Sequence, residues 1–354
     1  MIEDKHSAGF FAHSTLAVTV DGVSMGLLDQ QVWSRPRALK KEHNAHQKLP
    51  ITQKERMKWL KGLSAIQPHS VEMISGGDRE ADMDELFQEA QRTGRGTIVR
   101  AVGKRRLEAG TGLYAPLDQT PSATTYEVHG HRQKEQEAPQ AWIGLRYTTV
   151  TLLPPKNRTP ATRVIWLTAL TVQVVEVVEL DAPSAVSPIH WILLTNLGVE
   201  NLDQARQLVR FYPYRWLLER FHYVLKSGCR FEDSQLKSYD ALTRFLGLCS
   251  HQAWQSLTLL PQSRQTPDAP GDTILSPPEW QALIAQMTAD PTPATTCPTQ
   301  AQAMRGIAQL GGLMGRTSDG HPGAKVLWRG GQRLQDLAAI WQLFHPLTQD
   351  VGNV

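Results

Sequence analysis

The segment spanning residues 212–226 constrains the fold of this chain more than any other part of the sequence. It reads YPYRWLLERFHYVLK, and its spacing Y-x2-R-x3-E-x6-K sets out four polar residues: Tyr212, Arg215, Glu219 and Lys226. On a helix that turns about 100° per residue, these four side chains fall within one arc roughly 60° wide. Apolar side chains occupy the opposite arc, as a core-facing stripe requires: Leu217, Leu218, Phe221, Val224 and Leu225. The pattern predicts a helix that presents one carboxylate, two cations and a phenol to a phosphate-rich partner.

The composition is that of an ordinary soluble globular protein, and it limits where a nucleic acid can bind. The 354 residues are enough for a sizeable core and for about two or three domains. The formal net charge is only +3, so any surface for nucleic acid has to be local. Two basic clusters are candidates for such a surface: Arg35, Arg37, Lys40 and Lys41, and then Lys104, Arg105 and Arg106.

Cysteine usage and hydropathy both indicate a soluble protein of a reducing compartment. Cys229, Cys249 and Cys297 are odd in number and form no C-x-x-C pair, so neither a zinc site nor a disulfide framework is predicted. The first residues lack the apolar run of a signal peptide. The most apolar stretch, residues 164–180, is short, rich in valine and threonine, and interrupted by polar residues, which argues against a membrane helix. We expect a cytoplasmic protein.

The first 104 residues alternate between strand and helix patterns, which is typical of an α/β fold. Asp21-Gly22 sits between two alternating apolar runs and predicts a hairpin turn. The expected elements are a hairpin at 10–33, a helix at 54–63, a strand at 71–75, a helix at 82–92 and a strand at 97–102. We therefore interpret residues 1–104 as the N-terminal part of an α/β core.

The rest of the chain divides by composition into three further parts. Residues 105–196 are rich in glycine, proline and strand-like runs, which predicts an all-β insertion in the α/β core. Helical periodicity returns in residues 197–260, which include the Y-x2-R-x3-E-x6-K segment with Pro213 in its first turn. Proline-rich stretches and two shorter helices make residues 261–354 a C-terminal helical region.

Asp78 is the first candidate for a metal ligand. It follows a predicted buried strand and the turn Gly76-Gly77, a position from which a carboxylate can reach a cation beyond the sheet edge. Aspartate is also a favoured helix N-cap, and Asp82 and Asp84 suit a first helical turn. Local sequence leaves both interpretations open.

Glu219 and Trp191 each have a structural interpretation beside the functional one. A helical glutamate flanked by Arg215 and Arg220 is commonly part of a surface ion pair that stabilises little. The shared arc with Tyr212 and Lys226 favours a site instead. Trp191 begins a buried strand, where an aromatic residue belongs to the core, but it can also serve as a platform on which a base stacks.

Several segments together resemble one known family. The Y-x2-R-x3-E-x6-K segment, the sequence DREAD at residues 78–82 and the W-x-L-L-T strand at 191–195 are similar to the bacterial insertion-sequence transposases of the DDE class. These are cut-and-paste enzymes of the hairpin-forming group, with a β-rich insertion in an RNase H-like core. Other similar segments are residues 4–14, 27–33, 58–60, 318–323 and 328–334, so the resemblance covers nearly the whole chain.

The resemblance implies a chemistry and a role for each candidate residue. Such enzymes hold two divalent ions, Mg²⁺ or Mn²⁺ as a substitute, with two aspartates and one glutamate, and cleave and transfer DNA strands. Asp78 matches the second aspartate and Glu219 the glutamate. Tyr212, Arg215 and Lys226 match residues that grip DNA phosphates, while Trp191 matches a tryptophan that stacks on a flipped base. A further DNA contact is expected at Arg100.

The resemblance also implies partners and an architecture. The expected partners are double-stranded DNA at the terminal inverted repeats of an element, target DNA, and a second copy of the chain in a synaptic complex. The expected fold is an RNase H-like core with an all-β insertion and a helical C-terminal region.

The first aspartate of the family's triad has no counterpart in the sequence, so we interpret the chain as N-terminally truncated and expect it to be inactive alone. In the family that aspartate ends a strand between the hairpin and the Asp78 strand. Without this strand, the hairpin and the Asp78 strand lose their common neighbour. Two other functions stay open: a non-catalytic fragment that binds DNA or a transposase and inhibits it, and a two-metal nuclease that uses Asp78 and Glu219.

Overall fold

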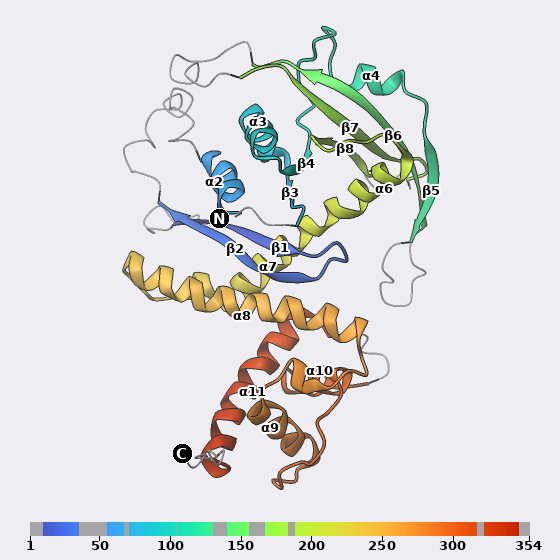
Figure 1. Cartoon of the computed structure of the whole chain (residues 1–354). Helices are drawn as coiled ribbons and strands as arrows, with labels where there is room; N and C mark the ends of the chain where they lie inside the picture. Colours follow the sequence, from blue (N-terminus) through green and yellow to red (C-terminus); the bar gives the residue numbers. More distant parts are fainter. Residues whose placement is uncertain are drawn as a thin grey trace, which may run out of the picture. The chain divides into compact units, whose positions relative to one another are not determined.

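A computed structural model describes residues 10–34, 55–66, 71–103, 105–129, 140–155, 167–182, 188–316 and 322–346 (Figure 1). Two compact units divide the chain. The first comprises Met1–Thr15 and Leu28–Arg215, and the second comprises Leu16–Leu27 and Trp216–Val354. The first basic cluster and parts of segments 4–14 and 318–323 lie outside the described residues. The expected domain boundaries after residues 104, 196 and 260 stay predictions.

A six-stranded sheet forms the centre of the first unit, in the order β3-β4-β8-β7-β6-β5. The core strands β3 (Ile74–Gly77) and β4 (Gly96–Arg100) are parallel. The remaining strands are antiparallel: β5 (Thr124–His129), β6 (Gln140–Leu152), β7 (Leu170–Glu179) and β8 (His190–Thr195). Because β8 pairs with β4, the strands of the expected insertion continue the core sheet. The insertion region also holds a short helix, α4 (Tyr114–Asp118), which the sequence did not predict.

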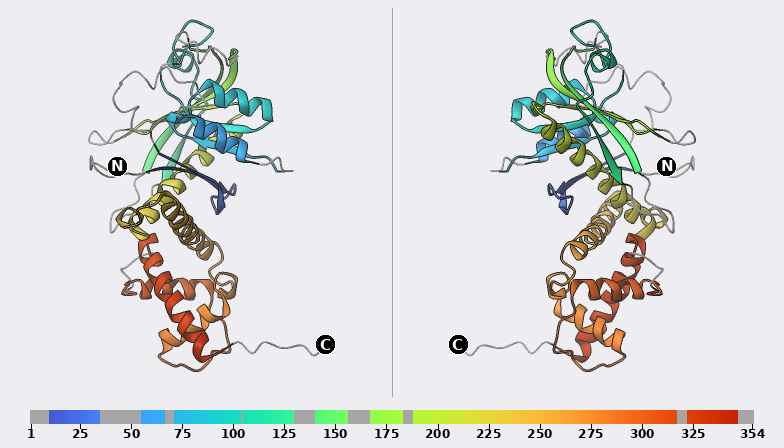
Figure 2. Two further views of the ribbon diagram at one scale, coloured as in Figure 1. Left: turned by 90° about the vertical axis from the view of Figure 1, so that its left-hand side faces the viewer. Right: turned by 90° about the vertical axis from the view of Figure 1, so that its right-hand side faces the viewer.

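Helices cover both faces of this sheet, since neighbouring residues on a strand point to opposite sides. Val174 and Leu194 pack with α2 (Met57–Ala65) and α3 (Asp84–Thr93) in one core cluster. Val175 and Leu193 pack with α6 (Leu202–Phe211) in a second cluster. The side views show α2 and α3 on one face and α6 on the other (Figure 2). Apolar residues lie on both faces of β7 and β8, since helices cover both sides of these strands.

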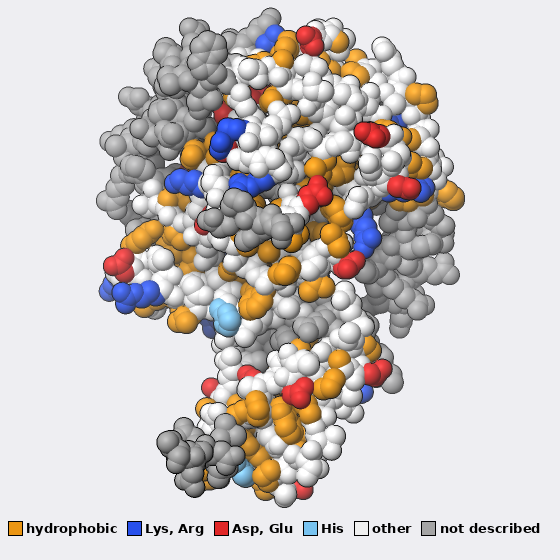
Figure 3. Space-filling view, viewed as in Figure 1, with side chains coloured by type: hydrophobic (Ala, Val, Ile, Leu, Met, Phe, Trp, Pro, Cys, Tyr) orange, Lys and Arg blue, Asp and Glu red, His pale blue; other side chains and the backbone are white. Residues whose placement is uncertain are grey.

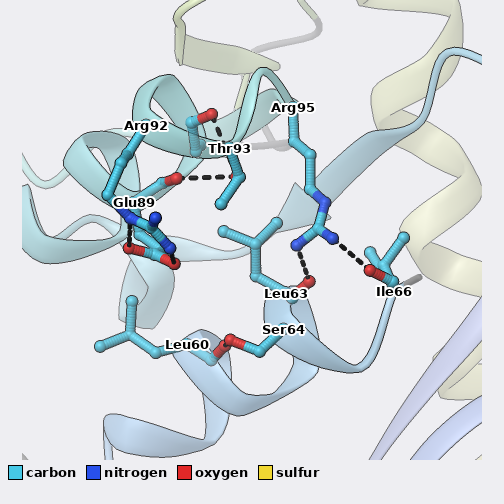
Figure 4. A network of polar contacts seen from close by, with 9 residues as sticks. Leu60, Leu63, Ser64, Ile66, Glu89, Arg92, Thr93 and Arg95 are labelled. Atoms are coloured by element: carbon cyan, nitrogen blue, oxygen red, sulfur yellow. Dashed lines mark hydrogen bonds and ion pairs between the residues drawn. The ribbon is translucent and has the colours of Figure 1, made fainter. Parts of the chain in front are cut away.

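Arg95 ties α2 to the end of α3. Its guanidinium donates to the carbonyl oxygen of Leu63 at 2.5 Å and to that of Ile66, which are orphan acceptors at the C-terminal end of α2 (Figure 4). Gly94 ends α3 in the left-handed conformation, with φ of 67°. The two helices that flank the start of the sheet are thereby fixed to each other.

The hairpin β1 (Phe11–Val18) and β2 (Ser24–Trp33) forms a separate two-stranded sheet. Its turn contains Gly22 at φ of 83°, as the Asp21-Gly22 signal predicts. Among the described strands, the hairpin does not pair with β3, and β3 lies at the edge of its sheet.

The segment expected as one regular helix is built from three kinds of helix. Residues Tyr212–Arg215 form the 3₁₀ turn η4, Trp216–Tyr223 form α7, and Val224–Gly228 form the π-helix η5. The prediction of a single arc is therefore wrong, because a 3₁₀ turn has about three residues per turn and a π-helix more than an α-helix. Tyr212 is buried, whereas Glu219 and Lys226 are exposed. The apolar side chains Phe221, Val224 and Leu225 are buried, as expected.

The second unit is largely helical. It contains η6 (Phe231–Asp233), α8 (Tyr239–Gln265), η7 (Gly271–Thr273), α9 (Pro277–Thr288), α10 (Gln300–Leu310) and α11 (Ala324–Phe344). A core cluster that includes Leu283, Ile307 and Leu334 joins α9, α10 and α11. The helices α10 and α11 cross closely, because a Cβ atom at Gly330 would collide with the carbonyl oxygen of Ile307. Hydrophobic side chains also lie on the surface of this unit (Figure 3).

No described helix combines the length and the apolar content that a membrane span requires.

Candidate functional site

Asp78 leaves β3 at a tight turn that only glycine permits. A Cβ atom at Gly77 would collide with the Cβ of Ala81, so the chain can fold back into the 3₁₀ turn η3 (Arg79–Ala81) only without a side chain there. Asp78 caps η3, and its Oδ1 accepts a hydrogen bond from the backbone N–H of Glu80 at 2.8 Å. Its other oxygen, Oδ2, has no polar partner among the described residues. Asp78 is thus an N-cap that keeps one carboxylate oxygen available.

A buried ion cluster holds the turn after Asp78 in place. The Oδ2 of Asp82 accepts the backbone N–H of Val102 at 2.6 Å, just beyond the end of β4. Arg105 donates to both carboxylate oxygens of Asp84, at 2.8 and 3.2 Å, and its Nε lies 3.5 Å from Asp82 Oδ1. Burial raises the pKa of the Asp82 carboxyl, against the opposing effect of the Arg105 charge. Arg105 therefore belongs to the interior, and the expectation that it forms part of a basic surface is wrong.

Arg100 and Trp191 lie on the same face of the sheet. Arg100 pairs in register with Leu193, so both side chains point to the α6 face, and Trp191 is two residues before Leu193 on β8. The Arg100 Nη2 donates to the carbonyl oxygen of His190 at 3.0 Å. Trp191 is partly buried and packs against the second core cluster. It meets the Tyr212 ring edge-on, with 5.4 Å between the ring centroids.

Tyr212 is the buried member of the candidate phosphate grip. Only 5% of its surface is exposed, and its buried hydroxyl has no hydrogen-bond partner within the described chain. The guanidinium of Arg215 lies over its ring, 5.9 Å from the centroid. The turn η4, which contains both residues, packs against β3. The first unit therefore gathers Tyr212, Arg215, Trp191 and Arg100 beside the strand that ends at Asp78.

Glu219 and Lys226 belong to the second unit, where His222 lies near both. Glu219 is exposed on α7, and Lys226 is exposed on η5 with its Nζ 3.1 Å from Glu232 Oε1. Burial lowers the pKa of His222, the Lys226 charge lowers it further, and the Glu219 charge opposes both. An exposed ion pair such as Lys226–Glu232 stabilises little.

The two candidate metal ligands have suitable chemistry. Mg²⁺ prefers carboxylate oxygens, and Asp78 has an oxygen to spare. Within the described ranges, no group of three or more histidine, cysteine, aspartate or glutamate side chains is arranged to hold a metal ion. The side chains of Asp78 and Glu219 are therefore of a type that can bind Mg²⁺.

Comparison with protein-family models decides the family. The model described as "Transposase DDE domain" matches residues 28–251, and the model described as "Transposase Tn5 dimerisation domain" matches residues 251–341. The chain belongs to the DDE transposases. The resemblance recognised in the sequence is confirmed at this level, and the DDE domain implies an RNase H-like fold for the mixed α/β unit described above. Divalent metal use is general in the family, and the dimerisation match indicates DNA binding as a homodimer.

Two features beside the candidate residues were not predicted from the sequence. His222 stands one helical turn after Glu219, and this spacing in the sequence indicates that the two side chains are neighbours on a helix. The Asp82–Arg105–Asp84 cluster gave no comparable signal. Its partners are separated in sequence, and a run of basic residues at 104–106 is typical of a solvated surface.

Proposed function

We propose that this chain binds DNA ends as the DDE and dimerisation regions of an insertion-sequence transposase, and that it does not cleave them alone. The observation that carries the proposal is the buried hydroxyl of Tyr212, which has no partner among the described residues and lies on the sheet face that also holds Arg100 and Trp191. A buried hydroxyl without a partner costs free energy. A DNA phosphate would supply the missing acceptor.

Each residue then has a role in holding DNA. Tyr212 donates a hydrogen bond to a phosphate oxygen, and Arg215, stacked over the Tyr212 ring, binds phosphate bidentately. Lys226 adds a point charge on the phosphate backbone. Trp191, whose orientation the edge contact with Tyr212 fixes, stacks on a base displaced from the strand end. Arg100 contributes a further contact on the same face.

Asp78 and Glu219 would each supply a carboxylate ligand for Mg²⁺. When bound, the metal supplies an activated water or 3′-hydroxyl and neutralises charge on the leaving oxygen. The protein's own contribution is to hold Asp78 rigid, through the Gly77 turn and the buried Asp82–Arg105 contact. Two carboxylates hold Mg²⁺ weakly, so we propose that the chain binds DNA but does not cut it unaided.

A nicking assay tests this function. The purified chain is incubated with linear and supercoiled DNA, with Mg²⁺ or Mn²⁺, beside the variants Glu219→Gln and Asp78→Asn. We expect DNA to be retained and to stay intact in all three samples. End-specific nicking that Glu219→Gln abolishes would contradict the proposed inactivity. Hydrolysis of small phosphoesters without DNA retention would instead indicate the two-metal nuclease.

The dimerisation match favours a second candidate function, that of an inhibitor. A chain that keeps residues 251–341 and the DNA grip can occupy an element end, or pair with an active transposase, without cleaving. Mixing this chain with a cleavage-competent transposase of the same element would slow cleavage. The slowing would require the dimerisation helices in addition to the DNA grip.

A further inference from the structure

The second unit brings together two cysteines that are twenty positions apart in sequence. Cys229 follows η5, and Cys249 lies in α8. The Cys229 thiol donates to the carbonyl oxygen of Cys249, with 3.6 Å between Sγ and oxygen. Cys249 is buried, with 5% of its surface exposed, whereas Cys229 is only half-buried. One thiol of the pair can therefore be reached from solvent while the other lies behind it.

The surroundings make the two thiols unequal. A hydrogen bond from Cys249 lowers the pKa of Cys229, and the same interaction, together with burial, raises the pKa of Cys249 well above its usual range. Cys229 is thus the better thiolate, which is the reactive form of a thiol. Cys249 is the protonated partner.

Trp328 of α11 provides a second, independent observation. Its indole ring packs against Gly228, with 3.3 Å from the position of a Cβ there to the ring. The indole N–H is buried and makes no hydrogen bond to a described residue, although its proximity lowers the pKa of Cys229. A neutral thiol is a weak acceptor and a thiolate a strong one. A thiolate at Cys229 would satisfy this donor.

We propose that Cys229 and Cys249 form an oxidation-sensitive dithiol site that a peroxide converts to an intramolecular disulfide. The reaction begins when the Cys229 thiolate attacks one peroxide oxygen, which breaks the O–O bond, forms a sulfenic acid and releases hydroxide that is protonated to water. The Cys249 sulfur then attacks the Cys229 sulfur. Its proton leaves with the displaced hydroxide as a second water, so one peroxide is reduced for each disulfide formed.

The bond would join η5 directly to α8. Lys226 lies in η5, so oxidation would cross-link the segment that carries one cation of the proposed DNA grip. A π-helical turn is an irregular stretch and often marks a functional position. The dithiol itself does not depend on the proposed function, because its test reads thiols and not DNA.

Thiol counting after peroxide treatment tests the site. The reduced full-length chain is exposed to hydrogen peroxide, denatured and labelled with a maleimide, and disulfide-linked peptides are mapped by mass spectrometry. The chain has three cysteines, so we expect the number of labelled thiols to fall from three to one, with Cys297 still labelled. Dithiothreitol should restore all three.

Three variants serve as controls. Cys297→Ser should still form the disulfide, whereas Cys229→Ser and Cys249→Ser should each leave the remaining thiols free of an intramolecular bond. Peptide mapping of the wild type decides the matter even if Cys249→Ser fails to fold. Three labelled thiols after treatment, a bond that includes Cys297, or a disulfide-linked dimer would each overturn the inference.

Discussion

At the scale of single residues, Asp78 shows how a structural and a chemical role coexist. One carboxylate oxygen caps η3, and the other has no partner within the described chain. The sequence alone offered the cap and the metal ligand as alternatives, but a carboxylate has two oxygens and can serve both. What the sequence could not show is why the turn is rigid. The support comes from Arg105, which follows β4 in the chain.

Arg105→Ala should destabilise the protein strongly. It leaves Asp82 and Asp84 buried without their counter-charge, which costs about 3–5 kcal/mol. The neighbouring change Arg106→Ala is the control, because Arg106 is exposed and its side chain donates to the Pro154 carbonyl oxygen. Urea unfolding at neutral pH measures the difference. Equal midpoints for the two variants would show that the cluster contributes nothing.

The stability that Arg105→Ala loses relative to the wild type should depend on pH in a defined direction. The pKa of Asp82 in the folded state is raised above its usual value of 3.8. Protonation of Asp82 therefore stabilises the folded protein fully below pH 3.8, and this stabilisation is lost as pH rises through the folded-state pKa. Arg105 opposes that rise, so Arg105→Ala raises the pKa further. The stability deficit of the variant should therefore shrink as pH falls towards 3.8. A deficit that grows on acidification would contradict the assignment.

His222 reports on the charges around it. Lys226→Ala should raise the pKa of His222 by removing a like charge, and Glu219→Gln should lower it by removing the one attractive partner. An NMR titration of the imidazole, assigned with His222→Gln, measures both. If neither variant moves the titration, Glu219 and Lys226 do not lie near His222.

At the scale of elements, the sequence predicted whether a segment is helix or strand better than it predicted the geometry of that segment. The hairpin, β3, β4, α2 and α3 were all predicted near their observed places, because their apolar periods are regular. Residues 212–226 were predicted as one helix, whereas the structure divides residues 212–228 into three helix types. The assumption of a regular α-helix over this whole segment was wrong. Pro213 lacks a backbone N–H, and an apolar stripe does not reveal a change of pitch.

The spatial neighbours of the candidate residues could not be predicted from the sequence for a similar physical reason. The candidate residues came from a one-dimensional spacing, and the register that places Arg100 beside Trp191 depends on β8 pairing with β4. That pairing joins strands far apart in the chain, and no local pattern sets it. The proximity of Cys229 and Cys249 likewise follows from the packing of α8 against η5, and no local pattern predicts it.

The crossing of α10 and α11 gives a prediction with a built-in control. Gly330→Ala puts a Cβ against the Ile307 carbonyl and should destabilise the second unit by about 3 kcal/mol. Gly331→Ala meets nothing within 4 Å and should be neutral or stabilise by up to about 1 kcal/mol. Thermal unfolding at one protein concentration compares them. Similar melting temperatures would mean that the helices do not cross at Gly330.

At the scale of the whole molecule, the dimerisation match predicts a self-associating chain. Ile340 lies on α11 inside the matched range and is 53% exposed, which suits an apolar contact with a second copy. Ile340→Glu should raise the dimer dissociation constant about tenfold or more, a change of about 1.4 kcal/mol. Gln342→Glu adds the same charge at an exposed position and should change the dimer dissociation constant little. Sedimentation equilibrium that shows equal association for both variants would place the interface elsewhere.

The central claim is that Tyr212, Arg215 and Lys226 grip DNA phosphates. The most direct measurement is the salt dependence of duplex binding, by fluorescence anisotropy, for Arg215→Gln/Lys226→Gln beside the equally charged control Lys61→Gln/Arg92→Gln. Each phosphate contact contributes about 0.9 to the magnitude of the slope of log affinity against log salt concentration. The slope for Arg215→Gln/Lys226→Gln should therefore be smaller in magnitude than that of the wild type by about 1.8. The control, altered on α2 and α3, should keep the wild-type slope. Equal slopes for all three proteins would contradict the account.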